Sequence, residues 1–97
     1  MGTSAAAPII DALETLKARL ATVSPAVSEP ANRALYHCER LSMALASSHA
    51  EGVRFAAFTI NHTVTTNEQA FGPEVGTAAA ALRSALDAAG YHIHFNF

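Results

Sequence analysis

Residues 53–66 have the sequence VRFAAFTINHTVTT, and a strand and a helix compete for this segment. Valine, isoleucine, phenylalanine and threonine, which β-strands favour, make up most of it. At a period of two, one face of a strand carries Ala56, Phe58, Ile60 and Val64. Because Gly52 also marks a break just before the segment, we predict a strand over residues 53–66.

A helix is the alternative for the same residues. At helical spacing, one apolar stripe consists of Val53, Ala57, Ile60 and Val64. The small residues Ser48, Gly52 and Ala56 then share a face, which allows two backbones to approach closely.

Two helices are predicted before this segment. The first opens at Pro8, a residue that suits the first turn of a helix. Its apolar stripe consists of Ile9, Leu13, Leu16, Leu20 and Val23. The second opens at Ser28, a suitable N-cap, and we expect Gly52 to end it in the left-handed conformation. Its stripe consists of Leu35, Cys38, Leu41, Leu45 and Ser48.

Two elements are predicted after the segment. A polar loop over residues 66–72 leads to a helix that opens at Pro73 and closes at Gly90. The apolar stripe of this helix consists of Val75, Ala79, Leu82 and Leu86. Residues 91–97 alternate strictly and so predict a strand. Its apolar face carries Tyr91, Ile93, Phe95 and Phe97, and its polar face carries His92, His94 and Asn96.

The predicted fold class is therefore α+β, in the order helix, helix, strand, helix, strand. The strand, helix and strand form one crossover unit, which places the two strands parallel. Because two strands do not make a stable sheet in water, we expect a second copy to complete it in a homodimer or higher homo-oligomer. The predicted interface consists of Tyr91, Ile93, Phe95 and Phe97. The alternative fold is a mostly α bundle with an extended strand at its C-terminus.

Length and composition restrict the class of protein. A chain of 97 residues forms one small domain, residues 1–97, in which we expect residues 1–7 to be flexible. The net charge is −2 and the six Lys and Arg residues are scattered, so there is no basic stripe for nucleic acid. No apolar run approaches the roughly 18 residues of a membrane-spanning helix, and no export leader is present. Together with the single Cys38, this predicts a cytoplasmic protein.

Two histidines form the only candidate metal site. On a strand, His92 and His94 point to the same side, roughly 6.5–7 Å apart. A divalent transition metal needs a third ligand, for which His62 on the neighbouring predicted strand is the best candidate. Further donors in reserve are Asn96, His49 and Glu51. More often, however, such a pair simply faces solvent.

No catalytic constellation accompanies these residues. Cys38 lies on an apolar stripe and is expected to be a small buried residue, while His37, Glu39 and Arg40 are expected on a solvated face. The carboxylates show no convergent spacing, and no phosphate-binding loop is present. We therefore predict a non-catalytic assembly or accessory subunit that acts through self-association and binding of a protein partner. The alternative is a metal- or ligand-binding protein, or a small enzyme, that uses His92, His94 and His62.

Overall fold

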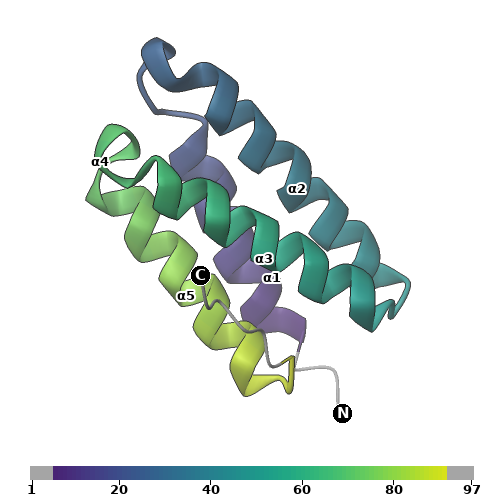
Figure 1. Cartoon of the computed structure of the whole chain (residues 1–97). Helices are drawn as coiled ribbons and strands as arrows, with labels where there is room; N and C mark the ends of the chain where they lie inside the picture. The colour runs from purple at the N-terminus through teal and green to yellow at the C-terminus, as the bar shows by residue number, and fades with distance from the viewer. Residues whose placement is uncertain (1–5, 92–97) are drawn as a thin grey trace.

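The computed structural model describes residues 6–91, and this part of the chain is built from helices (Figure 1). In chain order the elements are α1 (Ala6–Leu20), the 3-10 helix η2 (Pro25–Val27), α2 (Ser28–Ala46), α3 (Ala50–Thr66), α4 (Glu68–Phe71) and α5 (Pro73–Ala88). None of these helices is both long and apolar enough to cross a membrane.

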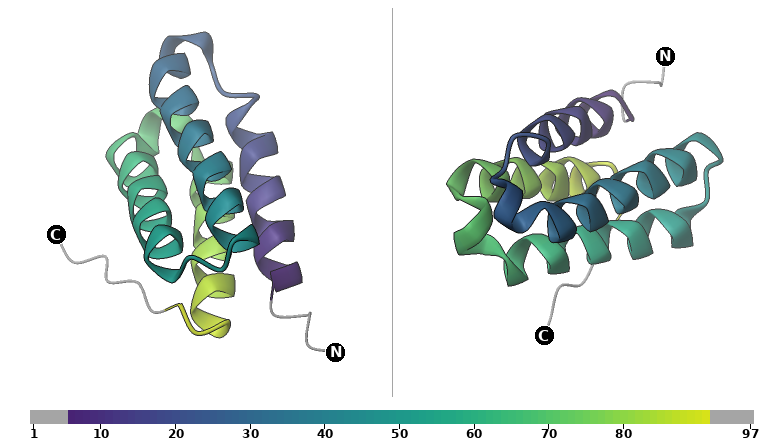
Figure 2. Two further views of the ribbon diagram at one scale, coloured as in Figure 1. Left: turned by 90° about the vertical axis from the view of Figure 1, so that its right-hand side faces the viewer. Right: turned by 90° about the horizontal axis from the view of Figure 1, so that it is seen from above.

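The four long helices form a ring around one core. α1 packs on α2, α2 on α3 and α3 on α5, and α5 closes the ring by packing on α1. Short connections reverse the chain between successive long helices, so neighbours run antiparallel (Figures 1 and 2). This is an up-and-down four-helix arrangement. Its radius of gyration is 12.6 Å, which matches a compact domain of this length.

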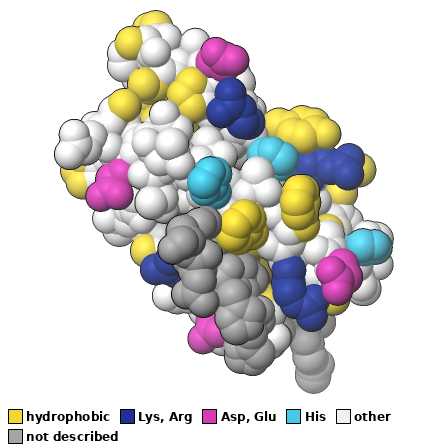
Figure 3. Space-filling view, in the orientation of Figure 1, with side chains coloured by type: hydrophobic (Ala, Val, Ile, Leu, Met, Phe, Trp, Pro, Cys, Tyr) yellow, Lys and Arg dark blue, Asp and Glu magenta, His cyan; other side chains and the backbone are white. Residues whose placement is uncertain are grey.

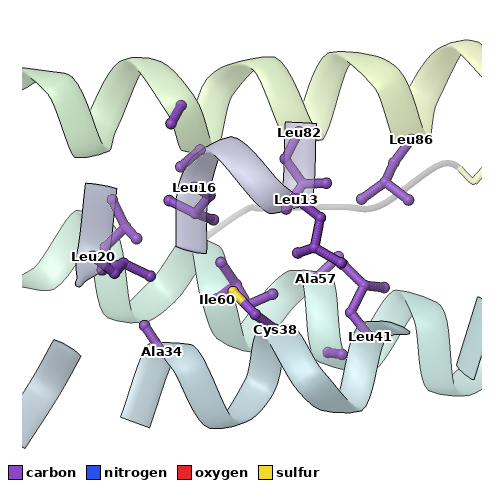
Figure 4. Close-up of a cluster of buried hydrophobic side chains, with 14 of the residues drawn as sticks. Leu13, Leu16, Leu20, Ala34, Cys38, Leu41, Ala57, Ile60, Leu82 and Leu86 are labelled. Carbon is purple, nitrogen blue, oxygen red and sulfur yellow. The ribbon is translucent and has the colours of Figure 1, made fainter. Parts of the chain in front are cut away.

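All four long helices contribute large side chains to the core, and α2, α3 and α5 add buried alanines. Leu13, Leu16 and Leu20 of α1 lie fully buried between the other helices (Figure 4). Where α2 packs on α3, the buried side chains include the small residues Ala34, Cys38 and Ala57. Small residues at a helix contact allow close packing, which explains how an alanine-rich chain still encloses a continuous core.

The prediction of a strand over residues 53–66 is wrong, because these residues belong to helix α3. The helical alternative describes them correctly. Its stripe is buried and consists of Val53, Ala57, Ile60 and Val64. Phe55 is exposed and Phe58 is only half-buried, so the period of two does not describe the packing. A helix satisfies its backbone hydrogen bonds internally, whereas a strand here has no neighbour with which to pair.

The α+β fold class is therefore also wrong, since residues 6–91 contain no strand. The expected crossover unit and its parallel sheet do not form, because the first of its two strands is α3. Of the predicted terminal strand, only Tyr91 lies within the described residues. Its side chain is half-buried and packs against the core.

The turn after α2 also differs from expectation. Ser48, with φ +55°, takes the left-handed conformation that we assigned to Gly52, and Gly52 lies inside α3. The His49 N–H donates to the Ala44 carbonyl at 2.9 Å, and the Ser48 N–H donates to the Leu45 carbonyl at 3.2 Å. This pair of bonds is a Schellman motif.

The end of α5 uses the same motif, and here the prediction is confirmed. Gly90 has φ +99°, its N–H donates to the Asp87 carbonyl at 3.0 Å, and the Tyr91 N–H donates to the Leu86 carbonyl at 2.9 Å. Tyr91 then covers the last turn of the helix, as the residue at this position of a Schellman motif commonly does.

Two further helix boundaries differ from the prediction. α1 begins at Ala6, so the segment predicted to be flexible overlaps the first turn of that helix. The predicted loop over residues 66–72 contains the short helix α4, in which Phe71 is buried. This aromatic side chain fixes the connection between α3 and α5 to the core.

Candidate functional site

Three of the four large hydrophobic side chains that are exposed among the described residues lie on the helix pair α2 and α3. The exposed fraction is 58% for Tyr36 and 62% for Met43 on α2, and 67% for Phe55 on α3. The fourth residue, Ile10, lies on α1 and is 48% exposed. Side chains of this size usually lie inside a small domain, so three of them around one helix pair mark a candidate binding surface.

These three residues border a groove of about 490 Å³, which we call the α2–α3 groove. From α2 it is lined by Tyr36, His37, Arg40, Met43 and Ala44, and from the turn and α3 by Ser47, His49, Gly52, Phe55 and Ala56. On the α2–α3 face, hydrophobic, His and basic side chains lie side by side (Figure 3).

The α2 side of the groove is a second stripe on that helix. Tyr36, Arg40, Met43 and Ser47 recur at spacings of four, three and four residues. Helix geometry therefore places them on one face, about 140–200° away from the buried Cys38. Because the Cys38 face of α2 packs into the core, the second stripe lies on the surface of the molecule.

Small residues line the groove near the turn between α2 and α3. A Cβ atom added to Gly52 would lie 3.2 Å from the Ala44 Cβ and 2.8 Å from the His49 Nδ1. The absence of a side chain at Gly52 thus lets α3 start directly against α2. This is the close approach that the sequence predicted for a helical face of Ser48, Gly52 and Ala56, although Ser48 lies in the turn before α3.

His49 caps α3 at the same end. Its Nδ1 accepts a hydrogen bond of 2.8 Å from the Gly52 N–H, which is one of the amides that have no partner within the helix. The imidazole is held against the turn by this bond. His49, which the sequence placed among the reserve metal ligands, therefore acts as a helix cap.

The opposite end of the groove is aromatic and basic. The ring of Tyr36 meets the His37 ring edge to face at 5.2 Å, and the Arg40 guanidinium carbon lies 6.0 Å from the Tyr36 ring centre. Burial lowers the pKa of His37, and the neighbouring charges of Arg40 and Arg33 lower it further. Because Arg40 and Arg33 disfavour the protonated form of His37, the electrostatic potential at this end of the groove is positive.

No carboxylate lines the α2–α3 groove within residues 6–91. Glu39, one residue before Arg40, turns the other way and pairs with Lys17 of α1 at 2.9 Å. Arg33 lies 3.7 Å from Glu29, whereas Arg40 forms no ion pair with any carboxylate in the part of the chain that the structure describes. The only unbalanced formal charge in the groove is therefore positive.

The predicted metal site is only partly within the described residues. His62 lies on α3 rather than on a strand, is exposed, and stacks on Phe58 with 6.2 Å between ring centres. His92 and His94 lie outside the described residues, as do Ile93, Phe95 and Phe97 of the predicted interface. Between residues 6 and 91, no three His, Cys, Asp or Glu side chains form a group able to hold a metal.

Cys38 is fully buried in the core, as predicted. Burial raises the pKa of its thiol to about 12, so the thiolate, which is the reactive form, is absent at neutral pH. The expectation of a solvated face holds for the exposed Glu39 and Arg40, whereas His37 is half-buried.

Sequence reasoning missed the groove residues Tyr36, Met43 and Phe55. The stripe of Tyr36, Arg40, Met43 and Ser47 was a usable signal, because a large apolar residue recurs one heptad apart outside the buried stripe. Phe55 gave no such signal, since its exposure depends on how α3 is rotated against the core. Comparison with protein-family models, with curated proteins and with solved structures finds no match.

Proposed function

We propose that this chain is a non-catalytic binding domain whose α2–α3 groove takes up part of a protein partner. The observation that carries the proposal is the gathering of Tyr36, Met43 and Phe55 around one groove. Binding hot spots are typically aromatic and arginine side chains that surround a pocket, and Tyr36, Phe55 and Arg40 are of this kind.

The chemistry of the groove supports binding rather than catalysis. His37 and Arg40 both line the groove, but within residues 6–91 no carboxylate lines it to orient the imidazole and no thiol lines it as a nucleophile. The small residues near the turn offer shape and apolar contact instead. A mobile methionine beside rigid aromatic rings is typical of a surface that accommodates an apolar partner.

Self-association through the terminal segment remains the second part of the proposal. Tyr91 contributes one apolar residue of the predicted interface and packs on the core of its own chain. The sequence pattern of residues 91–97 supports this part of the proposal.

Site-specific photocrosslinking tests partner binding. A photoreactive phenylalanine analogue replaces Phe55 in the full chain, and the matched control carries it in place of Ile10, the exposed apolar residue outside the groove. We expect a protein that crosslinks from position 55 only, binds the purified chain, and loses at least tenfold in affinity with Phe55→Ser. Identical crosslinked proteins from both positions, or crosslinked species made only of this chain, contradict groove-mediated partner binding.

A further inference from the structure

We infer that the partner segment that fits the α2–α3 groove is an acidic amphipathic helix. This inference rests on the proposed function and specifies the chemistry of its partner. It follows from three properties of the groove: its charge, its length and the backbone around it.

Charge favours an acidic occupant. The groove contains Arg40, which has no carboxylate partner among the described residues, and Arg33 lies close enough to lower the pKa of His37. A carboxylate placed beside Arg40 gains an attractive interaction without breaking an existing ion pair. A lysine or arginine at the same place meets a charge of its own sign.

The same charge disfavours a second copy of this chain in the groove. A two-fold dimer through the groove joins the same surface of both copies, so two grooves that each carry positive charge would meet. No carboxylate of the groove compensates this repulsion within residues 6–91. The groove therefore lacks the self-complementarity that such an interface requires, and a different polypeptide is the better occupant.

Backbone hydrogen bonding favours a helix over an extended peptide. An extended peptide gains affinity by pairing with the free edge of a sheet, and residues 6–91 offer no strand. A helix needs no such partner, because its backbone groups are already paired. It can place an apolar stripe into the groove and keep its polar side in water.

The length of the groove matches about three helical turns. From Tyr36 to Ser47, the cap that follows α2, the chain rises about 16 Å at 1.5 Å per residue. Tyr36 and Met43 are seven residues apart, so a bound helix with apolar residues at positions i, i+3, i+4 and i+7 spans both. Phe55 faces this stripe from α3.

Two synthetic peptides test the inference on the full-length, isotope-labelled chain. Both are stapled helices of about 14 residues with leucine at i, i+3, i+4 and i+7, and their polar faces carry glutamate in one and lysine in the other. In NMR titrations we expect the glutamate peptide to shift Tyr36, Arg40, Met43 and Phe55 signals, with at least tenfold higher affinity than the lysine peptide. Arg40→Glu is expected to reverse this preference, whereas Arg19→Glu on α1 leaves it unchanged.

Several outcomes overturn the inference. Equal binding of both peptides removes the charge argument but leaves groove-mediated binding intact, so it is distinguishable from failure of the proposed function. Binding of neither peptide, or shifts confined to residues outside the groove, removes the helical occupant. Concentration-dependent shifts of the groove residues without peptide identify a second copy as the occupant instead.

Discussion

Ser48 lies in a backbone conformation that serine rarely adopts, and this has a measurable cost. At φ +55° the Cβ atom crowds its own backbone, which costs about 1–2 kcal/mol in a non-glycine residue. Glycine avoids this crowding but loses more chain entropy on folding. We expect Ser48→Gly to raise the free energy of unfolding by about 0.5–1 kcal/mol, measured by urea denaturation, and to raise Tm by several degrees.

Ser47 provides the matched control, since it has an ordinary φ of −99° and its hydroxyl donates to the Met43 carbonyl at 3.0 Å. Ser47→Gly should therefore lower the free energy of unfolding by about 0.5–1 kcal/mol. If both substitutions change stability in the same direction, the left-handed turn at Ser48 is not present in solution.

His37 gives the stability of the fold a pH dependence. Its pKa is lowered by burial, by Arg40 and by Arg33, so the unfolded chain binds a proton at a pH where the folded chain does not. In the interval between the lowered pKa and the ordinary value near 6.5, the unfolded state binds more protons. The free energy of unfolding should therefore rise with pH through this interval and lose its dependence on His37 above it.

His37→Gln removes the titrating group, and we expect it to flatten the curve of unfolding free energy against pH just below pH 6.5. Arg40→Gln keeps the imidazole but removes one of the charges that lower its pKa, so the slope should decrease only in part. A wild-type curve that falls as pH rises through this interval, or one unchanged by His37→Gln, contradicts the assignment.

At the residue scale, the sequence predicted many of the buried positions, although Ser48 of the predicted α2 stripe is exposed in the turn, and it did not predict the groove. The stripe from Ile9 to Leu20 and the burial of Cys38 follow from helical spacing, because burial repeats with the helix period. The spacing of residues along one helix does not show which side chains of two helices meet at a groove. Their importance comes from Phe55 and Met43 lying near one another in space, which is a property of packing between two helices.

At the scale of elements, α3 was the misassigned segment for a physical reason. Its β-branched and aromatic residues cost a helix only tenths of a kcal/mol each. Burial of its stripe against α2 and α5 is worth roughly 1.5–3 kcal/mol for each large side chain, and so outweighs that cost. Both periodicities were visible in the sequence, but the identity of the neighbour, helix or strand, depends on the whole chain.

The helix α3 also makes a prediction about its glycine. A Cβ atom at position 52 displaces the His49 ring and pushes against Ala44, which removes the cap of α3 and overpacks the turn. We expect Gly52→Ala to lower the free energy of unfolding by about 1–2 kcal/mol, despite the better helix propensity of alanine.

Gly76 in α5 is the matched control, because a Cβ atom there meets nothing within 4 Å. Gly76→Ala should raise the free energy of unfolding by about 0.5–1 kcal/mol through helix propensity alone. Should Gly52→Ala stabilise the chain as much as Gly76→Ala does, the close contact between α2 and α3 is absent.

At the scale of the whole molecule, self-association through residues 91–97 remains a prediction. The expected dimer had to complete a two-stranded sheet, and that sheet does not form because residues 53–66 are helical. The alternation of apolar and polar residues still favours pairing of this segment with its counterpart in another copy. We expect a chain ending at Tyr91 to have the molar mass of a monomer by light scattering and the intact chain that of an oligomer. Equal masses for the two chains remove the interface assigned to Ile93, Phe95 and Phe97.

The α2–α3 groove exists only if residues 53–66 form a helix, because this places Phe55 opposite Tyr36 and Met43. The most direct test is the set of ¹³Cα secondary chemical shifts over these residues in the full-length chain. The structure predicts positive, helical shifts from Val53 to Thr66, without interruption. Negative, strand-like shifts over the same residues contradict the helical fold, the groove and the proposed partner together.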